Sequence, residues 1–430
     1  MKAPARAVDN RTDQLLKEKK MKSLEQNALE YHSHGQPGKI AIQVTKAVGS
    51  QADLSLAYSP GVAVPCIEIH KNPAKAYEYT AKGNLVGVIT NGTAVLGLGD
   101  IGALAGKPVM EGKSVLFKKF AGIDAFDIEI DETDPEKLVD IIAALHPTFG
   151  GINLEDIKAP ECFFIEHHLR DRLSIPVFHD DQHGTAIVVG AGLLNAVQLT
   201  GRDITKLKVV CSGAGAAAMA CLDLLLDLGV QRENIFVCDS RGVLTTNREL
   251  TKEKRAWAQN TDAKTMSDVM HMADMFLGVS GPGLLKQDDV KKMAAKPIVF
   301  ALANPEPELR PELVREVAPD AIVATGRSDY PNQINNALCF PYLFRAALDS
   351  AATNINQPMK LACVEALAAM ARSDEHFGRD YIVPTLLDKR LLTGVTPKIA
   401  TAAHESGVAR KHLNEEEYRA QLEALAKTLL

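Results

Sequence analysis

The second half of the chain has the most regular hydrophobic pattern. From about residue 183 onward, short apolar runs alternate with longer segments in which apolar residues recur every three or four positions. Short apolar runs are typical of strands buried on both faces, and the longer spacing is typical of helices. Their alternation predicts an α/β fold with a doubly wound parallel sheet of the Rossmann type. We expect helices over 184–199 and 216–228, a polar helical region over 247–275, strands over 207–211, 234–239, 298–302 and 321–324, and a strand with its loop over 275–281.

The first half is less regular, but several segments have a clear pattern. Apolar positions at helical spacing predict helices over 12–33, over 134–145 and in CFFIEHHLRDRL. FGGINLED and SIPVFHDDQHGTA predict strands that run into acidic residues. Two β-rich runs surround Asn91-Gly92, which is a strong signal for a β-hairpin. We therefore expect an N-terminal α/β domain over 1–181, the doubly wound domain over 182–385 and a mostly helical segment over 386–430.

Two glycine-rich segments compete as the binding site of a dinucleotide. The stretch Gly97–Gly102 matches the spacing G-x-G-x-x-G, but Gly106 and Pro108 follow so closely that we expect no helix there. A pyrophosphate is bound by N–H groups at the start of a helix. This first segment is therefore predicted to be a hairpin exit and turn that leads to Lys113 at the start of a β-rich run.

The second glycine-rich segment has the sequence context that the first one lacks. It follows the strand predicted at 207–211 and precedes about four helical turns of strong helix formers. Ala218 occupies the third position of the fingerprint, where a small residue lets helix and strand pack closely. The alternative is a tight turn that binds nothing. We predict that a dinucleotide binds here, through Gly213, Ala214, Gly215, Ala216, Ala217 and Ala218.

The next strand ends at Asp239, roughly 20 residues past the glycine turn, where such folds carry the residue that contacts the ribose. Asp239 alone would accept a hydrogen bond from the ribose 2′-OH of NAD. Ser240 and Arg241 follow directly and could bind the 2′-phosphate of NADP. The local sequence leaves both cofactors open.

Composition and charge narrow the class of protein. Apolar residues make up 46% and charged residues 24% of the 430 residues, and the formal net charge is −6. This balance gives no reason to expect binding to nucleic acid or to an anionic membrane. The seven cysteines include no C-x-x-C pair, so we expect reduced thiols and neither disulfides nor a zinc site. With no signal peptide and no apolar run of membrane-spanning length, we expect a cytoplasmic protein.

Two acidic pairs stand at the predicted ends of strands, Glu155-Asp156 and Asp180-Asp181. Four carboxylates brought together without basic neighbours would repel one another, and a hard divalent cation such as Mg²⁺ or Mn²⁺ would relieve this repulsion. The alternative is that each pair only caps the helix that follows. His183, beside the second pair, is expected to support the site or to pack, and not to bind zinc.

Tyr58 and Lys113 are candidates for a general acid and a general base. Tyr58 precedes Ser-Pro-Gly in a turn, and Lys113 follows the first glycine-rich segment. Both groups are too basic for such work unless burial or a neighbouring charge shifts their pKa, which a cleft lined by a metal ion would do. Without further information, a core tyrosine and a surface lysine are the alternatives.

Several motifs, in this order and spacing, resemble those of bacterial malic enzymes. They extend over roughly residues 35–345 and are YSPGVA, NGTAVLGLGDIGALAGKPVMEGK, GGINLEDIKAPECF, PVFHDDQHGTA, SGAGAAA, ALANPEPE and GRSDYPNQINNALCFP. The chain is most similar to the malic-enzyme half of bacterial hybrid proteins, whose second half is phosphotransacetylase-like. The resemblance implies that the tail before Leu430 falls where a linker to such a C-terminal domain would begin.

The resemblance implies the oxidative decarboxylation of (S)-malate to pyruvate and CO₂. It implies NADP⁺ as the preferred oxidant, with NAD⁺ as the alternative, because the hybrid forms generally use NADP⁺. It also implies that Tyr58 protonates the enol of pyruvate and that Lys113, supported by Asp180, takes the proton of the malate hydroxyl. The implied ligands of Mg²⁺ or Mn²⁺ are Glu155, Asp156 and Asp181.

The resemblance also implies roles for three asparagines in the second half of the chain. Asn304 is implied to contact cofactor and substrate, Asn335 to contact cofactor, and Asn336 to lie with Lys113 near the substrate. One position departs from the longer eukaryotic members, which carry a malate-binding arginine in TDGER where this chain has Ala94. The groups that bind the malate carboxylates therefore stay open.

We expect a homodimer or a higher homo-oligomer. Two other functions stay open: a different two-domain dehydrogenase, such as one that acts on amino acids, and a regulatory module that binds a metabolite without catalysis. A requirement for metal would separate a malic enzyme from the first. The intact set of Tyr58, Lys113 and acidic residues argues against the second.

Overall fold

The computed structural model describes residues 23–429 and forms two compact units, 1–45 and 46–430. In the described part of the first unit, α2 (Leu24–Ser33) begins at a capping box in which the side chains of Ser23 and Gln26 accept each other's backbone N–H. The C-terminal end of the predicted helix over 12–33 is thus confirmed. Residues 12–22 lie outside the described part of the chain.

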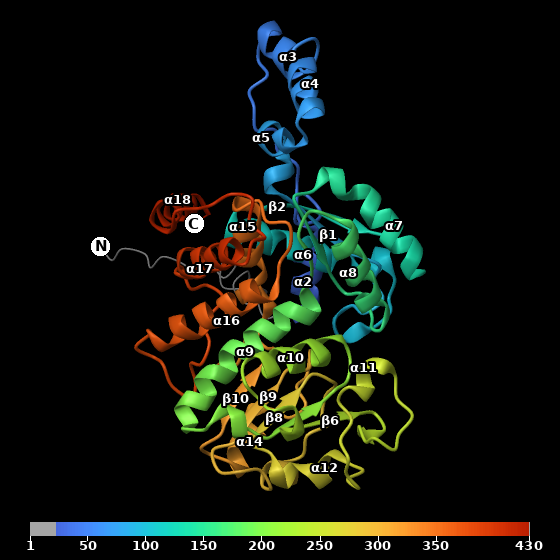
Figure 1. The fold of residues 1–430 in the computed structure, drawn as a ribbon, viewed down its shortest axis with the longest axis vertical. Helices are drawn as coiled ribbons and strands as arrows, with labels where there is room; N and C mark the ends of the chain where they lie inside the picture. The colour runs from blue at the N-terminus through green and yellow to red at the C-terminus, as the bar shows by residue number, and fades with distance from the viewer. Residues whose placement is uncertain (1–22, 430) are drawn as a thin grey trace, which may run out of the picture. The chain divides into compact units, whose positions relative to one another are not determined.

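The N-terminal half of the second unit contains a four-stranded parallel sheet in the order β2-β1-β3-β4. Helix α6 packs on β1 and β2, and α7 packs against α8 (Figure 1). The predicted strands in FGGINLED and SIPVFHDDQHGTA and the helix over 134–145 are confirmed. The elements are β1 (Leu85–Thr90), β2 (Asp124–Glu129), β3 (Gly151–Leu154), β4 (Val177–His179), α6 (Ala103–Ala121), α7 (Pro135–Leu145) and α8 (Glu161–Arg172).

The C-terminal half contains a six-stranded sheet in the order β10-β9-β8-β5-β6-β7, in which only β7 is antiparallel. The first strand lies in the middle of the sheet, so the order reverses there, as in a doubly wound fold. The predicted strands are confirmed. They are β5 (Val209–Ser212), β6 (Ile235–Asp239), β8 (Met275–Gly278), β9 (Ile298–Ala301) and β10 (Ile322–Thr325). The two-residue strand β7 (Gly242–Val243) was not predicted.

The long helix α9 joins the two sheets and packs against α10 and α16 (Figure 1). Its middle is buried on all sides, with small residues such as Gly190 and Gly192 in close contact with neighbouring side chains. The predicted helical C-terminus is confirmed. The larger helices are α9 (Asp180–Thr200), α10 (Ala216–Asp227), α14 (Pro311–Val317), α15 (Phe340–Asp349), α16 (Gln357–Arg372), α17 (Leu391–Glu405) and α18 (Glu415–Leu429).

The expected helical region over 247–275 is mostly wrong, because only two single-turn α-helices and a 3₁₀ turn (Met270–Met272) form there. The side chain of Thr251 caps the first α-helix, and the backbone N–H of Thr265, which precedes the second, donates to the side chain of Asp268. Polar residues between them bond to nearby backbone. The remaining short helices are α3 (Gln51–Ala57), α4 (Ala63–Lys71), α5 (Ala76–Tyr79), α11 (Lys252–Arg255), α12 (Met266–Val269) and α13 (Gln287–Val290).

The predicted hairpin at Asn91-Gly92 is also wrong. Strand β1 pairs in parallel with β2 and β3, and the chain after it forms a short 3₁₀ turn with a single bridge between Val95 and Gly99. Gly92 has φ +69°, and a Cβ there would lie 2.2 Å from the carbonyl oxygen of Gly102. This glycine thus allows a close contact between two loop segments. The local sequence alone does not distinguish such a contact from a hairpin turn.

The prediction that Gly106 and Pro108 prevent a helix is wrong as well. Helix α6 begins directly after Gly102 and runs through both residues for 19 positions. Pro108 removes the hydrogen bond to the carbonyl of Leu104, an exposed residue whose carbonyl can bond to water instead. Packing of the buried face of α6 against the sheet outweighs the local penalty, so Lys113 lies in the middle of a helix and not in a β-rich run.

Candidate active site

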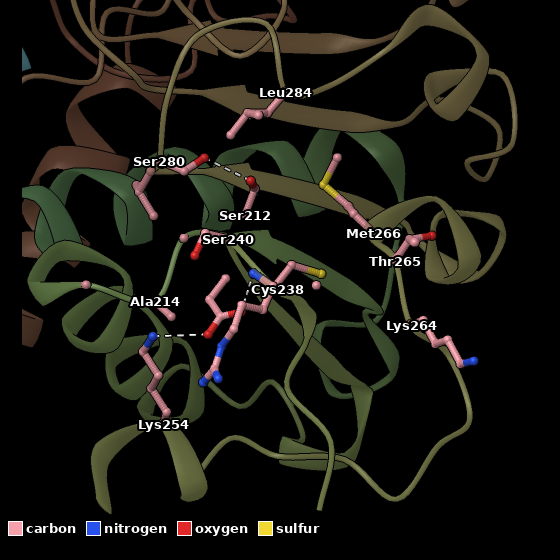
Figure 2. A pocket seen from close by; sticks show the side chains of 16 residues that line it. Ser212, Ala214, Cys238, Ser240, Lys254, Lys264, Thr265, Met266, Ser280 and Leu284 are labelled. Carbon is pink, nitrogen blue, oxygen red and sulfur yellow. Dashed lines mark hydrogen bonds and ion pairs between the residues drawn. The ribbon is translucent and has the colours of Figure 1, made fainter. Parts of the chain in front are cut away.

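The turn between β5 and α10 lines one cavity of about 710 Å³, which we call the nucleotide cavity. Gly213 has φ +121°, and a Cβ there would lie 2.6 Å from the carbonyl oxygen of Val279, so only glycine fits without strain. Gly215 precedes α10 and leaves the first N–H groups of the helix uncapped by a side chain. These features suit a bound pyrophosphate. Figure 2 shows the cavity, which is lined by Ser212, Gly213, Ala214, Gly215, Cys238, Asp239, Ser240, Arg241, Gly242, Lys254, Lys264, Thr265, Met266, Val279, Ser280 and Leu284.

The structure brings six of the predicted nucleotide residues to this cavity. They are Gly213, Ala214, Gly215, Asp239, Ser240 and Arg241. Ala216, Ala217 and Ala218 form the first turn of α10 and do not line the cavity. Ala218 is buried, as the predicted close packing of helix and strand requires.

The acidic residue at the end of β6 is already engaged by cations. Both carboxylate oxygens of Asp239 accept hydrogen bonds from Arg248 at 2.8 and 2.9 Å, and Lys254 donates one at 3.1 Å. Burial alone would raise the pKa of Asp239, but these bonds lower it below its usual value. Arg248 and Lys254 could not be identified from the sequence, because nothing in a polar stretch of irregular structure places its cations near the end of β6.

A second cavity of about 470 Å³, which we call the carboxylate cavity, joins residues from both sheets. Parallel strands β3 and β4 are neighbours, with Leu154 opposite His179, so the acidic pairs that follow them meet at one edge of the sheet. Asparagines from the loops after β9 and β10 complete the wall. The lining residues are Val109, Gly112, Lys113, Leu116, Glu155, Asp156, Asp181, Thr185, Leu302, Asn304, Gly326, Ile334, Asn335 and Asn336.

Lys113 is the buried cation at the centre of this cavity's acidic groups. Its Nζ lies 2.6 Å from Oδ2 of Asp180 and 2.8 Å from Oε1 of Glu155, and it stands over the ring of Phe340. Burial opposes the charged form of Lys113, but Asp180 and Glu155 outweigh burial and raise its pKa above the usual value. Asp180 itself lies behind Lys113 and does not line the cavity.

Glu155, Asp156 and Asp181 form a cluster in which one ligand atom from each lies within 4.8 Å of the others. The backbone N–H of Asp156 donates to Oδ2 of Asp181 at 2.8 Å, which ties the two strand ends together. Burial raises the pKa of both Glu155 and Asp181. Three convergent carboxylates with no nitrogen or sulfur ligand fit a hard divalent cation such as Mg²⁺ or Mn²⁺.

The alternative that each acidic pair only caps a helix does not describe this arrangement. The N-cap residues of α8 and α9 are Pro160 and His179, and neither helix has a side-chain cap. The side chain of Asp180 also packs closely against Gly184, where a Cβ would lie 2.0 Å from its Oδ1. The pairs are instead packed against each other and against Lys113.

A second buried ionic group surrounds His183, the residue expected to support the site or to pack, and its other members, Glu166 and Lys360, were not identified from the sequence. His183 Nε2 contacts both carboxylate oxygens of Glu166 at 2.9 Å, and Lys360 Nζ lies 3.0 Å from His183 Nδ1. Burial would raise the pKa of Glu166, but His183, His179 and Lys360 lower it to about 2. Glu166 also accepts the backbone N–H of His179, so this group connects α8 and α16 to the start of α9.

Tyr58 lies outside both cavities. It ends α3, its side chain is largely in solvent with 75% of the residue exposed, and α3 and α4 contain no buried residue. Ala94, by contrast, is beside the carboxylate cluster, where its N–H donates to the backbone oxygen of Asp156 at 2.9 Å. An arginine is thus missing from a position next to the cluster, as the sequence analysis noted.

The fold and the nucleotide cavity place the chain in the class of α/β proteins with a Rossmann-like dinucleotide-binding domain. Residues 37–170 match the model of the malic enzyme N-terminal domain, and residues 182–407 match the model of the malic enzyme NAD binding domain. The chain therefore belongs to the malic enzyme family. Among residues 23–429, no helix has both the length and the hydropathy needed to cross a bilayer.

Three relatives illustrate this membership. The chain is 59% identical to an NADP-dependent malic enzyme of Escherichia coli (strain K12), over 90% of this chain and 53% of the relative. It is 52% identical to an NADP-dependent malic enzyme of Halomonas elongata, over 90% of this chain and 95% of the relative. A crystal structure of malic enzyme from Pyrococcus horikoshii superposes with a TM-score of 0.86 at 43% identity, covering 94% of this chain and 96% of that one. The chain spans about half the length of several curated relatives that it matches.

Proposed function

We propose that this chain catalyses the oxidative decarboxylation of (S)-malate to pyruvate and CO₂ with reduction of NADP⁺ or NAD⁺. The observation that carries the proposal is the buried Lys113, bound to Asp180 and Glu155 on the wall of a cavity that Asp156, Asp181 and the loop asparagines complete. A cofactor in the nucleotide cavity supplies the hydride acceptor. Family membership supports the same reaction.

Glu155, Asp156 and Asp181 are the residues that would hold the divalent cation. When bound, such a cation supplies Lewis-acid polarisation of the substrate oxygens. The chain contributes three oxygen ligands on two neighbouring strand ends, held together by the bond from the N–H of Asp156 to Asp181. All three side chains line the carboxylate cavity, so a cation held by them would be accessible to a substrate bound there.

Lys113 is proposed as the general base that takes the proton of the malate C2 hydroxyl. Asp180 and Glu155 hold its ammonium group in place, and they also favour its charged form. A divalent cation held by Glu155 and Asp181 would add positive charge near Nζ, and it would thereby favour the neutral form of Lys113 that a general base needs. Asp180 is then the positioning residue that keeps Nζ aimed at the hydroxyl.

Asn304, Asn335 and Asn336 are proposed to bind substrate and cofactor from the other wall. All three line the carboxylate cavity, and they come from the loops after β9 and β10 at the carboxyl edge of the six-stranded sheet. Ligands of open α/β sheets bind at this edge. The amides offer donors to the malate carboxylates, next to a position where Ala94 offers none.

Tyr58 is proposed as the general acid, acting in the active site of a second copy within a homodimer. Its exposed position on α3 is accompanied by exposed apolar residues nearby, such as Leu56 at 76% and Val64 at 64%. Exposed apolar groups that gather on one segment mark an interface. A C₂ dimer would cover this surface twice and bring each Tyr58 to its partner's carboxylate cavity.

Mixed dimers test this assignment. Tyr58→Phe and Lys113→Met are each expected to be inactive alone, but a mixture that exchanges subunits should recover about a quarter of wild-type activity, because half the dimers hold one complete site. No recovery in samples shown by ultracentrifugation to exchange would contradict the shared site.

NADP⁺ is proposed as the preferred cofactor. Arg241, Lys254 and Lys264 line the nucleotide cavity around a single carboxylate, Asp239, which Arg248 and Lys254 already engage. The excess of cations favours a 2′-phosphate, and an occupied Asp239 is a poorer acceptor for a ribose 2′-OH.

The domain organisation follows these roles. We propose a substrate and metal domain over 1–181, an NAD(P)-binding domain over 182–385 and a helical C-terminal segment over 386–430. The two separate sheets, divided by α9, support this division.

A spectrophotometric assay tests the proposed reaction. Malate and Mn²⁺ with NADP⁺ should give rising absorbance at 340 nm and an equal amount of pyruvate, with slower reduction of NAD⁺. A chelator should abolish the signal. No reduction of either nucleotide in the presence of malate and Mn²⁺ would contradict the proposal.

A further inference from the structure

A buried carboxylate lies between the two cavities and has no part in the roles assigned above. Glu308 follows β9 on the way to α14 and has no exposed surface. The pKa of Glu308 is set by burial and by hydrogen bonds, and no charged side chain of the described residues is among the causes of its shift. Burying a carboxylate without a cation costs free energy, so this side chain calls for an explanation.

Each oxygen of Glu308 accepts from a different loop. Oε1 accepts the backbone N–H of Ser280 at 3.0 Å and the hydroxyl of the same residue at 3.3 Å. Oε2 accepts the backbone N–H of Ala303 at 3.1 Å. The side chain therefore bridges the loops that follow β8 and β9 at the carboxyl edge of the sheet.

These two loops belong to the two cavities. Ser280 lines the nucleotide cavity and shares a hydrogen bond of 2.8 Å with Ser212, the last residue of β5 (Figure 2). Ala303 stands between Leu302 and Asn304, which both line the carboxylate cavity. Glu308 thus ties a loop of the nucleotide cavity to a loop of the carboxylate cavity, and a dinucleotide that extends from the first cavity to the second would pass these two loops.

The site is built for a carboxylate. Two backbone N–H groups need two acceptor oxygens, and a glutamine would offer one oxygen and place an NH₂ against the other donor. Gly278 adds room, because a Cβ there would lie 2.4 Å from Cδ of Glu308. Burial raises the pKa of Glu308, while the bonds from Ser280 and Ala303 favour the charged form.

We propose that Glu308 is a positioning residue whose buried negative charge makes the chain bind the oxidised nicotinamide cofactor in preference to the reduced one. The nicotinamide ring of NADP⁺ carries a positive charge that NADPH lacks. A fixed negative charge beneath the strand ends stabilises the cationic ring in a region of low dielectric, and it does not act on the neutral ring. This inference rests on the proposed use of NAD(P) by the chain.

The test measures the dissociation constants of NADP⁺ and NADPH by calorimetry, with saturating Mn²⁺ and without malate. Glu308→Gln should lower the preference for NADP⁺ over NADPH by about three- to tenfold, as expected for the loss of one nearby charge. Glu308→Asp keeps the charge and should keep the preference. Asp289→Asn, which removes a buried carboxylate that lines neither cavity, should lower thermal stability without moving the preference.

The outcomes separate this inference from the proposed function. If the wild-type protein binds neither nucleotide, the proposed function fails. If it binds both and Glu308→Gln weakens both equally, Glu308 only ties the loops together and the inference is overturned. Should Glu308→Gln not fold, Glu308→Asp decides, because a loss of the preference while the charge is kept overturns the inference and retention supports it.

Discussion

The two glycine-rich segments of this chain look alike in sequence and serve different ends. Gly97–Gly102 and Gly213–Ala218 both follow a central parallel strand, and both lead into a long helix, α6 or α10. The turn before α10 is three residues long and opens the N-terminus of the helix into the nucleotide cavity. The segment before α6 is a 12-residue excursion after β1, and α6 presents the side chain of Lys113, near its middle, to the carboxylate cavity.

The difference teaches that the fingerprint is defined by the length of the turn as well as by its glycines. A short turn leaves the helix N–H groups at the strand end, where a pyrophosphate can reach them. A long excursion moves the start of the helix away from the strand end. The helix can then contribute to a site through its side chains and not through its N–H groups. Gly102, the N-cap of α6, lines neither cavity, whereas Gly213 and Gly215 both line the first.

The largest effect is expected when the side chain presented by α6 is removed. Lys113→Met should lower turnover of malate by about 10³-fold, since a positioned general base contributes 10²–10⁴-fold. Lys118→Met, an exposed position on the same helix, serves as the control and should leave turnover unchanged. Steady-state rates at 340 nm measure both, and equal rates for wild type and Lys113→Met would remove the base from α6.

A smaller effect is expected at the proposed metal ligands near α6. Asp181→Asn removes a carboxylate ligand and should raise the Mn²⁺ concentration needed for half-maximal activity by about 10- to 100-fold. Asp171→Asn, on the exposed surface of α8, should leave it unaltered. A titration of activity with Mn²⁺ compares the two, and an unchanged requirement in Asp181→Asn would count against this ligand.

A change in the turn before α10 is expected to weaken binding of the nucleotide. Gly213→Ala places a Cβ against the carbonyl of Val279 at a positive φ, so the turn must move and NADP⁺ should bind about tenfold more weakly. Gly201→Ala shares the positive φ but meets nothing within 4 Å, and should lower stability without affecting NADP⁺. Calorimetric binding of NADP⁺ checks both, and intact binding by Gly213→Ala would argue for a different site.

An effect no larger than that at Gly213 is expected on the choice of nucleotide in the nucleotide cavity. Lys254→Gln removes one cation near Asp239 and should lower the ratio of kcat/KM for NADP⁺ over NAD⁺ by about tenfold, the value of one charge-assisted hydrogen bond. Lys252→Gln lies on the same short helix but outside the cavity, and should leave the ratio unchanged. If the ratio stayed the same in Lys254→Gln, the 2′-phosphate would be bound elsewhere.

The same comparison shows what could be predicted from the sequence. Strands β5, β6, β8, β9 and β10 were predictable because each is a short, mostly buried apolar run, and α10 because its residues are strong helix formers. The two-residue edge strand β7 has no such run and was not predicted. Helix α6 was not, because Gly106 and Pro108 lower its local propensity and only the packing of residues such as Phe117 against the sheet outweighs that penalty.

The contacts within the site likewise divide into those that the sequence predicts and those that it does not. The meeting of Glu155-Asp156 with Asp180-Asp181 was predictable, since both pairs end strands that a parallel sheet can place side by side. The contacts of Arg248 with Asp239, of Lys360 with His183 and of Glu308 with Ser280 were not, because they join positions whose approach depends on the tertiary fold.

Binding of NADP⁺ to Lys113→Met tests most directly the central claim that α6 carries the chemistry and the turn before α10 binds the dinucleotide. Because Lys113 lines the carboxylate cavity and not the nucleotide cavity, calorimetry should give a dissociation constant within about twofold of wild type, while the same sample does not oxidise malate. Loss of NADP⁺ binding in this variant, in a protein that is still folded, would contradict that division.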